Sequence, residues 1–509
     1  MASTIDFVAR HAETMPAKPA IITEDRSLDF RTLNDRANKA ANVLQALGCE
    51  ADDRVAAMSF NAIEQMEVVS ASRKSGVIIV PVNYRLRGSE VAYVVNDSGA
   101  KIVAADDEHV DAVEAARPQL TGEPRLVALG ERVMPGWLGY RKLMGAAPAT
   151  PLADSGGGAL GASMIYTSGT TGNPKGAFRP HGVDIENILQ VVSLFELTQS
   201  DVHLLCGPSY HSAVAFFGAL NTLLGATNVV QPKFNAEDAL DLIERHRVTT
   251  TFMAPTLLQR MADAQERKPR DVSSLRALII GAAPFPYALK VRSEAVFGQV
   301  LWEFYGATET GFNTVLRPED QLRKPGSCGT AVPGQEIRLV RADGTEAGLG
   351  EPGELMVRNG WLAEYYQRPD ATAGSLHDGF FSVGDIAYKD EEGFYYICDR
   401  RIDMIISGGV NIYPAEVEAV LHAHPAVMDA AVIGVPDDEW GESVKAVVQL
   451  RSGAVATEAD LIAFCDSRLA GYKKPRSVDF VDELPRDAAG KLLKRQIREP
   501  YWTHAGRKI

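Results

Sequence analysis

Apolar residues recur every three or four positions in some stretches of the chain and run together in others. The stretch FRTLNDRANKAANVLQAL, residues 30–47, predicts an amphipathic helix from the spacing of Leu33, Ala37, Ala40, Ala41 and Leu44. Buried parallel strands are predicted by DRVAAMSF, SGVIIVPV, HLLCG, ATNVVQP, VTTTFMAP and RALIIGAAP. Because helical stretches and apolar runs alternate, the pattern predicts an α/β fold, with a large N-terminal domain of layered βαβ sheets.

The C-terminal part of the chain predicts a smaller α+β domain. A helix is expected to start near Pro414, and another at the capping box formed by Thr457 and Asp460. VMDAAVIGV and SVKAVVQL predict strands between these helices. The preceding segment, DRRIDMIISGG, is charged and ends in two glycines. We therefore predict an N-terminal domain over residues 1–400 and a C-terminal domain over residues 401–509.

Composition narrows the class of protein. With 509 residues, the chain is longer than one hydrophobic core usually serves, and 46% hydrophobic with 23% charged residues is typical of a globular protein. The formal net charge of -14 argues against non-specific nucleic-acid binding. A polyanionic substrate would therefore need positive groups clustered locally.

Cysteine usage and the N-terminus indicate the compartment. The five cysteines are widely separated and show no metal-binding spacing, which favours free thiols in a reducing compartment. The start of the chain contains acidic residues and does not resemble a signal peptide. No run of 18 apolar residues predicts a transmembrane segment. We expect a cytoplasmic protein.

The segment YTSGTTGNPKGAF, Tyr166 to Phe178, is rich in glycine and hydroxyl side chains and contains one lysine. It nearly fits the P-loop pattern, but Pro174 replaces the second glycine and Gly176 replaces the magnesium-binding Ser or Thr. It lies between a strand-like SMIY and a helical DIENILQVVSLFEL, so its N–H groups and hydroxyls could bind phosphate oxygens. On composition alone, a flexible surface turn remains the alternative.

The whole string closely resembles the phosphate loop of the adenylate-forming superfamily, which includes acyl-CoA synthetases, nonribosomal-peptide adenylation domains and luciferases. YGATE, residues 305–309, resembles the second nucleotide motif of that family, and FFSVGD, ending at Asp385, resembles its ribose motif. Arg400 in DRRIDMIISGG and Lys491 in ELPRDAAGKLLKR resemble the next two motifs. The motifs occur in the family's order over nearly the whole chain, which is then expected to be a carboxylate–CoA ligase.

The resemblance implies a two-step reaction with ATP, Mg²⁺ and CoA. Lys491 would bridge the carboxylate and the α-phosphate, Thr308 would bind the α-phosphate, and Glu309 would hold Mg²⁺. The remaining nucleotide-binding residues it implies are Thr167, Ser168, Gly169, Thr170, Thr171, Gly172, Lys175, Gly281, Ala282, Ala283, Pro284, Tyr305, Gly306, Ala307, Asp385 and Arg400. Taken singly, these residues also fit solvated charges, turns and packed rings.

The acyl and CoA sites are carried by weaker patterns. By resemblance His211 is an aromatic gate, and Phe216, Phe217 and Phe285 could line an apolar acyl pocket. The spacing in AVAFFGALNTLL is equally typical of a buried helix face. The candidate CoA contacts are Gly408, Gly409, Trp440, Lys473, Lys474 and Arg476, for which a solvated basic loop is the alternative.

Several alternatives stay open at this point. The family rotates its small domain about a residue that corresponds to Ile402, and the flanking Arg401 or Asp403 could take that role here. A carrier protein could replace CoA, but Asn235 stands where amino-acid-activating members have an aspartate. A non-catalytic nucleotide sensor is a third interpretation, and a luciferase-like oxygenase shares the same motifs. Family resemblance also suggests a homodimer.

Overall fold

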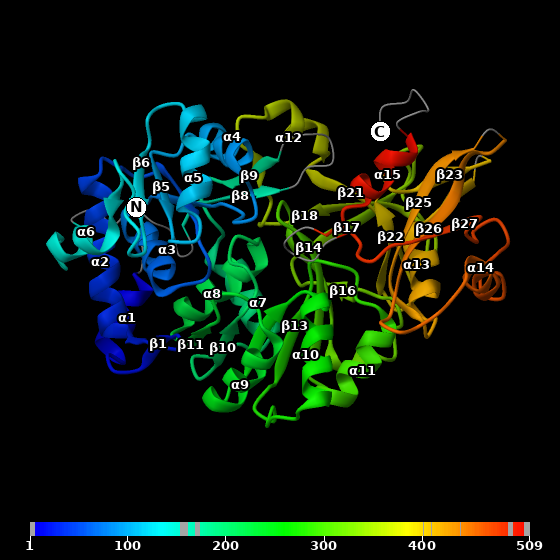
Figure 1. Ribbon diagram of the computed structural model, residues 1–509, viewed down its shortest axis with the longest axis horizontal. Coiled ribbons are helices and arrows are strands. Elements are labelled where there is room, and N and C mark those ends of the chain that lie inside the picture. Colours follow the sequence, from blue (N-terminus) through cyan, green and yellow to red (C-terminus); the bar gives the residue numbers. More distant parts are fainter. Residues whose placement is uncertain are drawn as a thin grey trace. The chain divides into compact units, whose positions relative to one another are not determined.

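The computed structural model describes residues 6–152, 161–167, 174–400, 402–408, 410–437, 439–486 and 492–502. Two compact units are formed by segments that alternate along the chain. The first contains residues 1–280, 306–311 and 359–374, and the second contains residues 281–305, 312–358 and 375–509. The N-terminal elements thus build one unit, while the C-terminal elements join the second (Figure 1).

A largely parallel sheet forms much of the first unit. Its strands follow the order β2 (Ser27–Asp29), β1 (Pro19–Ile22), β11 (Thr227–Val230), β10 (Val202–Leu205), β12 (Thr250–Met253) and β13 (Ala277–Ile280). All of these neighbours pair in parallel except β1 and β2. The helices that connect or flank them are α1 (Phe7–Thr14), α7 (Ile185–Leu194), α8 (Ser212–Leu224), α9 (Ala236–His246) and α10 (Pro255–Arg267).

A second parallel sheet in this unit is covered by helices on both faces. Its order is β4 (Ile78–Pro81), β3 (Arg54–Met58), β5 (Ile102–Ala105), β6 (Arg125–Ala128) and β7 (Leu138–Gly139). Successive side chains of a strand point to opposite faces, so Val55 packs with one core and Ala56 with the other. The covering helices are α4 (Gly88–Ser98) and α5 (Val110–Ala116) on one face, and α2 (Phe30–Ala46), α3 (Ile63–Ser75) and α6 (Tyr140–Ala146) on the other.

A short antiparallel sheet flanks the phosphate-loop motif. Strands β8 (Ser163–Thr167) and β9 (Lys175–Arg179) pair with each other, and β19 (Glu364–Tyr365) pairs with β9. Thr167 and Lys175 are Cα partners at the end of the β8–β9 ladder. The register therefore places the Thr167 and Lys175 side chains of the motif opposite each other.

The second unit contains α11 (Tyr287–Phe297), most of β14 (Leu301–Ala307) and β15 (Gly311–Leu316), and β16 (Thr330–Ala331), whereas the turn at residues 306–311 belongs to the first unit. An antiparallel sheet follows, with the order β17 (Glu336–Val340), β18 (Gly353–Arg358), β21 (Phe380–Lys389) and β20 (Leu376–His377). The last strand before the predicted domain boundary, β22 (Tyr395–Arg400), pairs with β21 and sets Asp385 opposite Arg400. The helix α12 (Pro369–Ser375), between β19 and β20, belongs to the first unit except for its last residue.

The C-terminal residues of the second unit have a hydrophobic core of their own. Strands β25 (Val427–Asp437), β26 (Gly441–Leu450) and β27 (Ser477–Phe480) form a sheet, and β23 (Ile405–Ser407) pairs with β24 (Val410–Ile412). The accompanying helices are α13 (Pro414–His422), α14 (Glu458–Asp466) and α15 (Lys494–Trp502). Their core contains Ile405, Val417, Val432 and Leu461.

The predicted α/β fold class is confirmed. The amphipathic stretch at residues 30–47 is α2, and the six apolar runs are β3, β4, β10, β11, β12 and β13. Pro414 occupies the first turn of α13, and Thr457 and Asp460 form the capping box of α14. The domain boundary at residue 400 stays a prediction. Among the described residues, no helix combines the length and hydropathy needed to cross a bilayer.

Candidate active site

Glu309 lies in the turn between β14 and β15 and is the carboxylate of the first unit's candidate site. Its side chain is only 8% exposed, and its Oε1 accepts hydrogen bonds from Thr167 Oγ1 at 3.2 Å and from the Tyr365 hydroxyl at 3.1 Å. The Lys175 ammonium lies 4.7 Å from the centre of the Tyr365 ring. Three segments far apart in sequence therefore bring a lysine, two hydroxyls and one carboxylate together.

Arg179, at the end of β9, fixes the turn that carries Glu309. Its Nη2 donates to the carbonyl oxygen of Thr308, and its Nε donates to that of Trp361. Burial lowers the pKa of Arg179 to about 10, and Glu309 is the acidic group that opposes this shift. The backbone N–H of Ala363 also donates to the carbonyl oxygen of Glu309 at 2.8 Å.

Thr308 is bound from its side chain as well. Its hydroxyl shares a hydrogen bond of 3.0 Å with Ser212 Oγ, in the first turn of α8. His211 is the N-cap residue of that helix, and its ring lies 4.6 Å from the Tyr210 ring. The predicted gate and the predicted α-phosphate ligand are thus connected through α8.

The predicted acyl residues occupy different surroundings. Phe216 is half-buried, and its ring centre lies 5.4 Å from that of Trp361. Phe217 is fully buried, stacked on Phe252 at 5.5 Å, and belongs to the helix core that the sequence left open as an alternative. Phe285 is buried in the second unit, where Lys290 lies 5.2 Å from its ring centre. Phe216 has the surroundings that best suit an acyl contact.

The ribose motif forms a second cluster, in the second unit. The Tyr305 hydroxyl donates to Asp385 Oδ2 at 2.6 Å, and Arg400 Nε lies 3.4 Å from Asp385 Oδ1. Burial and the neighbouring Asp385 carboxylate hold the pKa of Tyr305 well above its usual value. Asp385 is 6% exposed, so the β21–β22 register presents one buried carboxylate between a phenol and a guanidinium.

Gly281, Ala282, Ala283 and Pro284, which the family resemblance implies as nucleotide-binding residues, follow directly after β13. A Cβ on Gly281 would lie 3.0 Å from the ring of Phe304, so a small residue suits this position. Ala282 adopts a φ of +69°, a left-handed conformation that is strained for any residue with a Cβ. Strain of this kind gathers at binding sites. Ala283 and Pro284 complete the loop, and Gly306 and Ala307 end β14.

The predicted CoA contacts cluster in part. Gly408 has a φ of +58°, and a Cβ there would lie 2.6 Å from the Trp440 ring. The guanidinium of Arg476 lies 5.4 Å from the centre of the same ring, which is 40% exposed. Lys474 instead pairs with Asp466 at 2.7 Å, and Lys473 pairs with Glu416 at 2.7 Å. Arg476 lies 4.0 Å from Asp437, a longer ion pair than those of the two lysines, so Trp440 and Arg476 are better placed than the lysines to meet a ligand.

Lys494 lies three positions beyond the predicted catalytic lysine and is held among carboxylates. Its Nζ is 2.9 Å from Glu418 Oε1 and 3.6 Å from Asp399 Oδ2, and its side chain is 13% exposed. Glu418, Asp399 and Asp403 together raise the pKa of Lys494 against the lowering effect of burial. This cluster joins β22, α13 and α15.

The predicted hinge contacts the same helix. Ile402 is 49% exposed, and its carbonyl oxygen accepts a hydrogen bond of 2.9 Å from Arg498 in α15. The backbone N–H groups of Asp403 and Met404 donate to the carbonyl oxygen of Arg400, which closes a turn around Ile402. A hinge at Ile402, or at the flanking Arg401 or Asp403, stays a prediction.

Both parts of the chain match known protein families. Residues 8–367 match the AMP-binding enzyme family, and residues 416–491 match the AMP-binding enzyme C-terminal domain. The chain belongs to the AMP-binding enzyme family. The predicted superfamily is confirmed by this match.

Similar proteins cover almost the full length of this AMP-binding enzyme. It is 34% identical to the fatty acid–[acyl-carrier-protein] ligase ScoC of Streptomyces coeruleorubidus, over 98% of its own chain and 96% of that protein. It is 34% identical to the indoleacetate–CoA ligase of Aromatoleum aromaticum, over 97% of each. The crystal structure of ATP-bound MatB from Rhodopseudomonas palustris superposes with a TM-score of 0.87 at 31% identity, over 99% of both chains. The predicted enzyme type, an AMP-forming carboxylate–CoA ligase, is confirmed by the family match and by CoA-ligase relatives such as the indoleacetate–CoA ligase.

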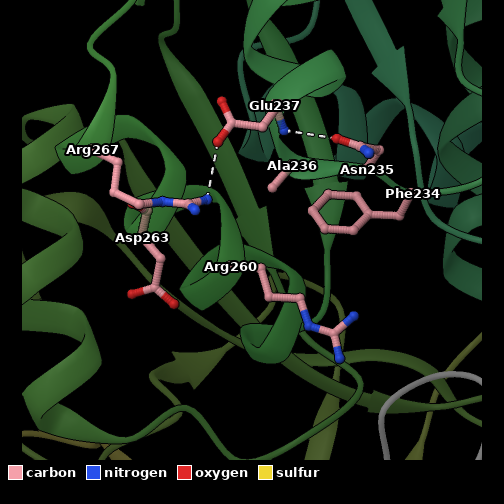
Figure 2. Close-up of a pocket in the computed structure, with 7 residues that line it drawn as sticks. All are labelled: Phe234, Asn235, Ala236, Glu237, Arg260, Asp263 and Arg267. Atoms are coloured by element: carbon pink, nitrogen blue, oxygen red, sulfur yellow. Dashed lines mark hydrogen bonds and ion pairs between the residues drawn. The ribbon is translucent and has the colours of Figure 1, made fainter. Parts of the chain in front are cut away.

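An open hollow of about 580 Å³ lies between α9 and α10 of this AMP-binding enzyme. It adjoins Asn235, which stands where amino-acid-activating members of the family have an aspartate. Figure 2 shows Arg267 directed at Glu237, with 2.9 Å between their charged groups, and the Glu237 N–H directed at Asn235. The Asn235 side chain caps α9 by accepting from the backbone N–H groups of Glu237 and Asp238. Asn235 thus has a structural role here.

Several predicted site residues of the AMP-binding enzyme lie outside the described residues: Ser168, Gly169, Thr170, Thr171, Gly172, Gly409 and Lys491. Sequence reasoning missed Arg179, Ser212, Trp361 and Tyr365, which hold the Glu309 turn. Lys175 and Arg179 share one face of a strand because side chains alternate, a signal that could have found Arg179. Tyr365 had no comparable signal.

Proposed function

We propose that this protein activates an apolar carboxylic acid with ATP, releases pyrophosphate, and transfers the acyl group from acyl-AMP to the thiol of CoA. The observation that carries the proposal is the Glu309 cluster, which gathers Thr167, Lys175 and Thr308 from the two nucleotide motifs around one buried carboxylate. The ribose-motif cluster of Tyr305, Asp385 and Arg400 supports a nucleotide substrate.

In the first step, the carboxylate of the acid attacks the α-phosphorus of ATP and pyrophosphate leaves. Negative charge that builds on the α-phosphate is met by donors already in place: the Thr308 hydroxyl, held by Ser212, and the Lys175 ammonium on the adjoining strand. Lys491 is proposed as the cation that bridges acid and phosphate. A net charge of -14 makes such local cations necessary, because the overall field repels ATP.

Mg²⁺ is proposed to accompany the phosphates. Within the described ranges, no group of three His, Cys, Asp or Glu side chains gathers into a metal site. One buried carboxylate beside two hydroxyls suits an ion that keeps its remaining ligands from phosphate and water. Glu309 would hold the ion, which when bound neutralises phosphate charge.

In the second step, the thiol of CoA attacks the acyl carbon and AMP leaves. The proposed CoA surface is Trp440 with Arg476, an exposed ring under a guanidinium, beside the left-handed Gly408. An aromatic face with a cation suits an adenine ring and its phosphates. His211, at the start of α8, is proposed as the gate between the acyl and thiol channels.

The experiment measures the two half-reactions separately. Pyrophosphate release is followed across a panel of fatty, aryl and alicyclic acids, and thioester formation is followed after CoA is added. Lys491→Ala should abolish pyrophosphate release, whereas Lys142→Ala, at an exposed position of α6, should leave it unchanged. Full activity of Lys491→Ala would overturn the mechanism, and ATP binding without pyrophosphate release from any acid would favour the sensor interpretation.

A carrier protein is the second candidate acceptor, because ScoC, 34% identical over 98% of this chain, is a fatty acid–[acyl-carrier-protein] ligase. Asn235 caps a helix and offers no carboxylate to the ammonium group of an amino acid. This supports a carboxylic acid substrate that has no ammonium group. Competition between CoA and a phosphopantetheine-bearing carrier protein for the same acyl-AMP would separate the two acceptors. Faster acyl transfer to the carrier protein than to CoA would make the carrier protein the first candidate acceptor.

We place the enzyme in the cytoplasm, because all five of its cysteines are free thiols. Detection of the labelled protein in separated cell fractions would test this location. The homodimer suggested by the family resemblance stays a prediction, and sedimentation velocity would test it. The boundary at residue 400 would be tested by limited proteolysis, which should cleave first near residues 400–402.

A further inference from the structure

Arg179 is a buried cation with an unusual set of partners. The residue is 8% exposed and ends β9, four positions after Lys175. Its Nε and Nη2 donate to two backbone carbonyl oxygens, those of Trp361 and Thr308. In the part of the chain that the structure describes, it forms no ion pair.

Two other buried cations among the described residues, Lys290 and Arg270, are paired with carboxylates. Lys290 pairs with Glu303, and Arg270, 9% exposed, pairs with Glu237 at 2.6 Å and Asp241 at 2.9 Å. A buried charge is costly unless its surroundings compensate it, and carbonyl dipoles compensate a guanidinium less completely than a carboxylate does. Burial accordingly lowers the pKa of Arg179, and Glu309 is the acid whose field it feels.

The two carbonyl groups belong to the segments that shape the candidate site. The Thr308 carbonyl is part of the peptide plane that leads into Glu309, so holding its oxygen fixes the direction in which Glu309 leaves the backbone. Trp361 packs on Gly311, where a Cβ would lie 2.7 Å from its side chain, and its ring meets that of Phe216. Asn359 Nδ2 further ties the Trp361 segment to the Thr310 carbonyl at 2.9 Å.

We propose that Arg179 is a positioning residue of the adenylation step, which locks the Thr308–Glu309 turn to the Trp361 segment. Its planar guanidinium reaches both carbonyls at once, a geometry that a lysine ammonium on a flexible stem does not reproduce. The inference rests on the proposed function for its reaction, but the locking of the turn is a property of the fold alone.

The kinetic test compares Arg179→Met, Arg179→Lys and a matched control, Arg270→Met, which removes an equally buried arginine on the segment after α10. Misplacing a catalytic group by about 1 Å costs on the order of 100-fold in rate, so Arg179→Met should lower kcat for pyrophosphate release by about that factor. Arg179→Lys should recover part of it, and KM for ATP should change less than kcat. A kcat for Arg179→Met equal to that of the wild type would overturn the proposal.

Amide hydrogen exchange gives a readout that needs no activity. Exchange in residues 306–311 should accelerate in Arg179→Met, and less in Arg179→Lys, while Arg270→Met should leave that segment unchanged. Unaltered exchange there in both Arg179 variants would overturn the inference. If Arg179→Met does not fold, Arg179→Lys carries both measurements. A wild-type enzyme that adenylates no acid would refute the proposed function, and the exchange result would still decide the role of Arg179.

Discussion

Arg179 is a buried cation of the first compact unit and Lys494 a largely buried cation of the second, but they are neutralised differently. Arg179 donates to two backbone carbonyls, and burial lowers its pKa to about 10. Lys494 lies among Glu418, Asp399 and Asp403, which raise its pKa. Carboxylates around a cation cancel most of its electrostatic field, so its charge contributes mainly to the stability of the fold. Backbone dipoles cancel less of the field, so much of it still acts on the neighbouring site.

The two clusters should therefore respond differently to the loss of a charge. Removing Lys494 leaves three acidic groups without their cation, which affects stability first. Changing the Glu309 turn leaves the hydrophobic cores intact, so it affects turnover first. Four measurements test this contrast.

Lys494→Met should have the largest effect on stability. Removing one partner of a buried ion pair typically costs about 3–5 kcal/mol, because the remaining charge is left uncompensated. The free energy of unfolding in urea measures the loss, and Lys494→Arg, which keeps the charge, should recover most of it. A loss below about 1 kcal/mol would show that the carboxylates do not depend on this lysine.

Glu309→Gln should have the largest effect on activity. Losing a group that stabilises transition-state charge typically lowers the rate about 100- to 1000-fold, and pyrophosphate release should fall by this order. The free energy of unfolding should fall less than in Lys494→Met, because a glutamine side chain can still accept the hydrogen bonds from Thr167 and Tyr365. Glu364→Gln, exposed on the neighbouring β19, is the control and should retain activity. Similar losses in both variants would contradict a specific role for Glu309.

Tyr365→Phe should have a smaller effect on the same measurement. The substitution removes one hydroxyl that donates to Glu309 at 3.1 Å, while Thr167 still donates at 3.2 Å. A hydrogen bond to a charged group contributes about 1.5 kcal/mol or more, which corresponds to a rate about tenfold lower. Tyr366→Phe is the neighbouring control, because that ring packs against Phe178 at 5.4 Å. Equal rates for the two variants would remove Tyr365 from the site.

Alkaline pH should produce the smallest change, in the stability of the Lys494 cluster. The pKa of Lys494 is raised in the folded state above its ordinary value of 10.5, so its stabilising contribution is complete below that pH. The contribution is lost as the pH rises above 10.5, by at most about 1.4 kcal/mol per pH unit. The difference in free energy of unfolding between the wild type and Lys494→Met should therefore narrow above pH 10.5. A constant difference would contradict the raised pKa.

Much of the fold followed from local patterns. The three- and four-residue spacing in residues 30–47 predicted α2, and apolar runs bounded by turn residues predicted β10 to β13, because burial on both faces of a parallel sheet requires such runs. The capping box at Thr457 was readable because its two partners are three residues apart. Glu309, Asp385 and Arg400 were found through motifs, each a short contiguous string.

Local patterns in the chain were enough to predict several helices and strands, the family, and the chemical groups that can meet ATP. The convergence of Tyr365, Ser212 and Arg179 on the Thr308–Glu309 turn became visible only in the folded chain, since they are separated from the turn by 56, 96 and 129 residues. It also decided that Asn235 caps a helix and that Phe217 belongs to a core. Local spacing encodes helix and strand periodicity, but partners distant in sequence meet only through the packing of whole sheets.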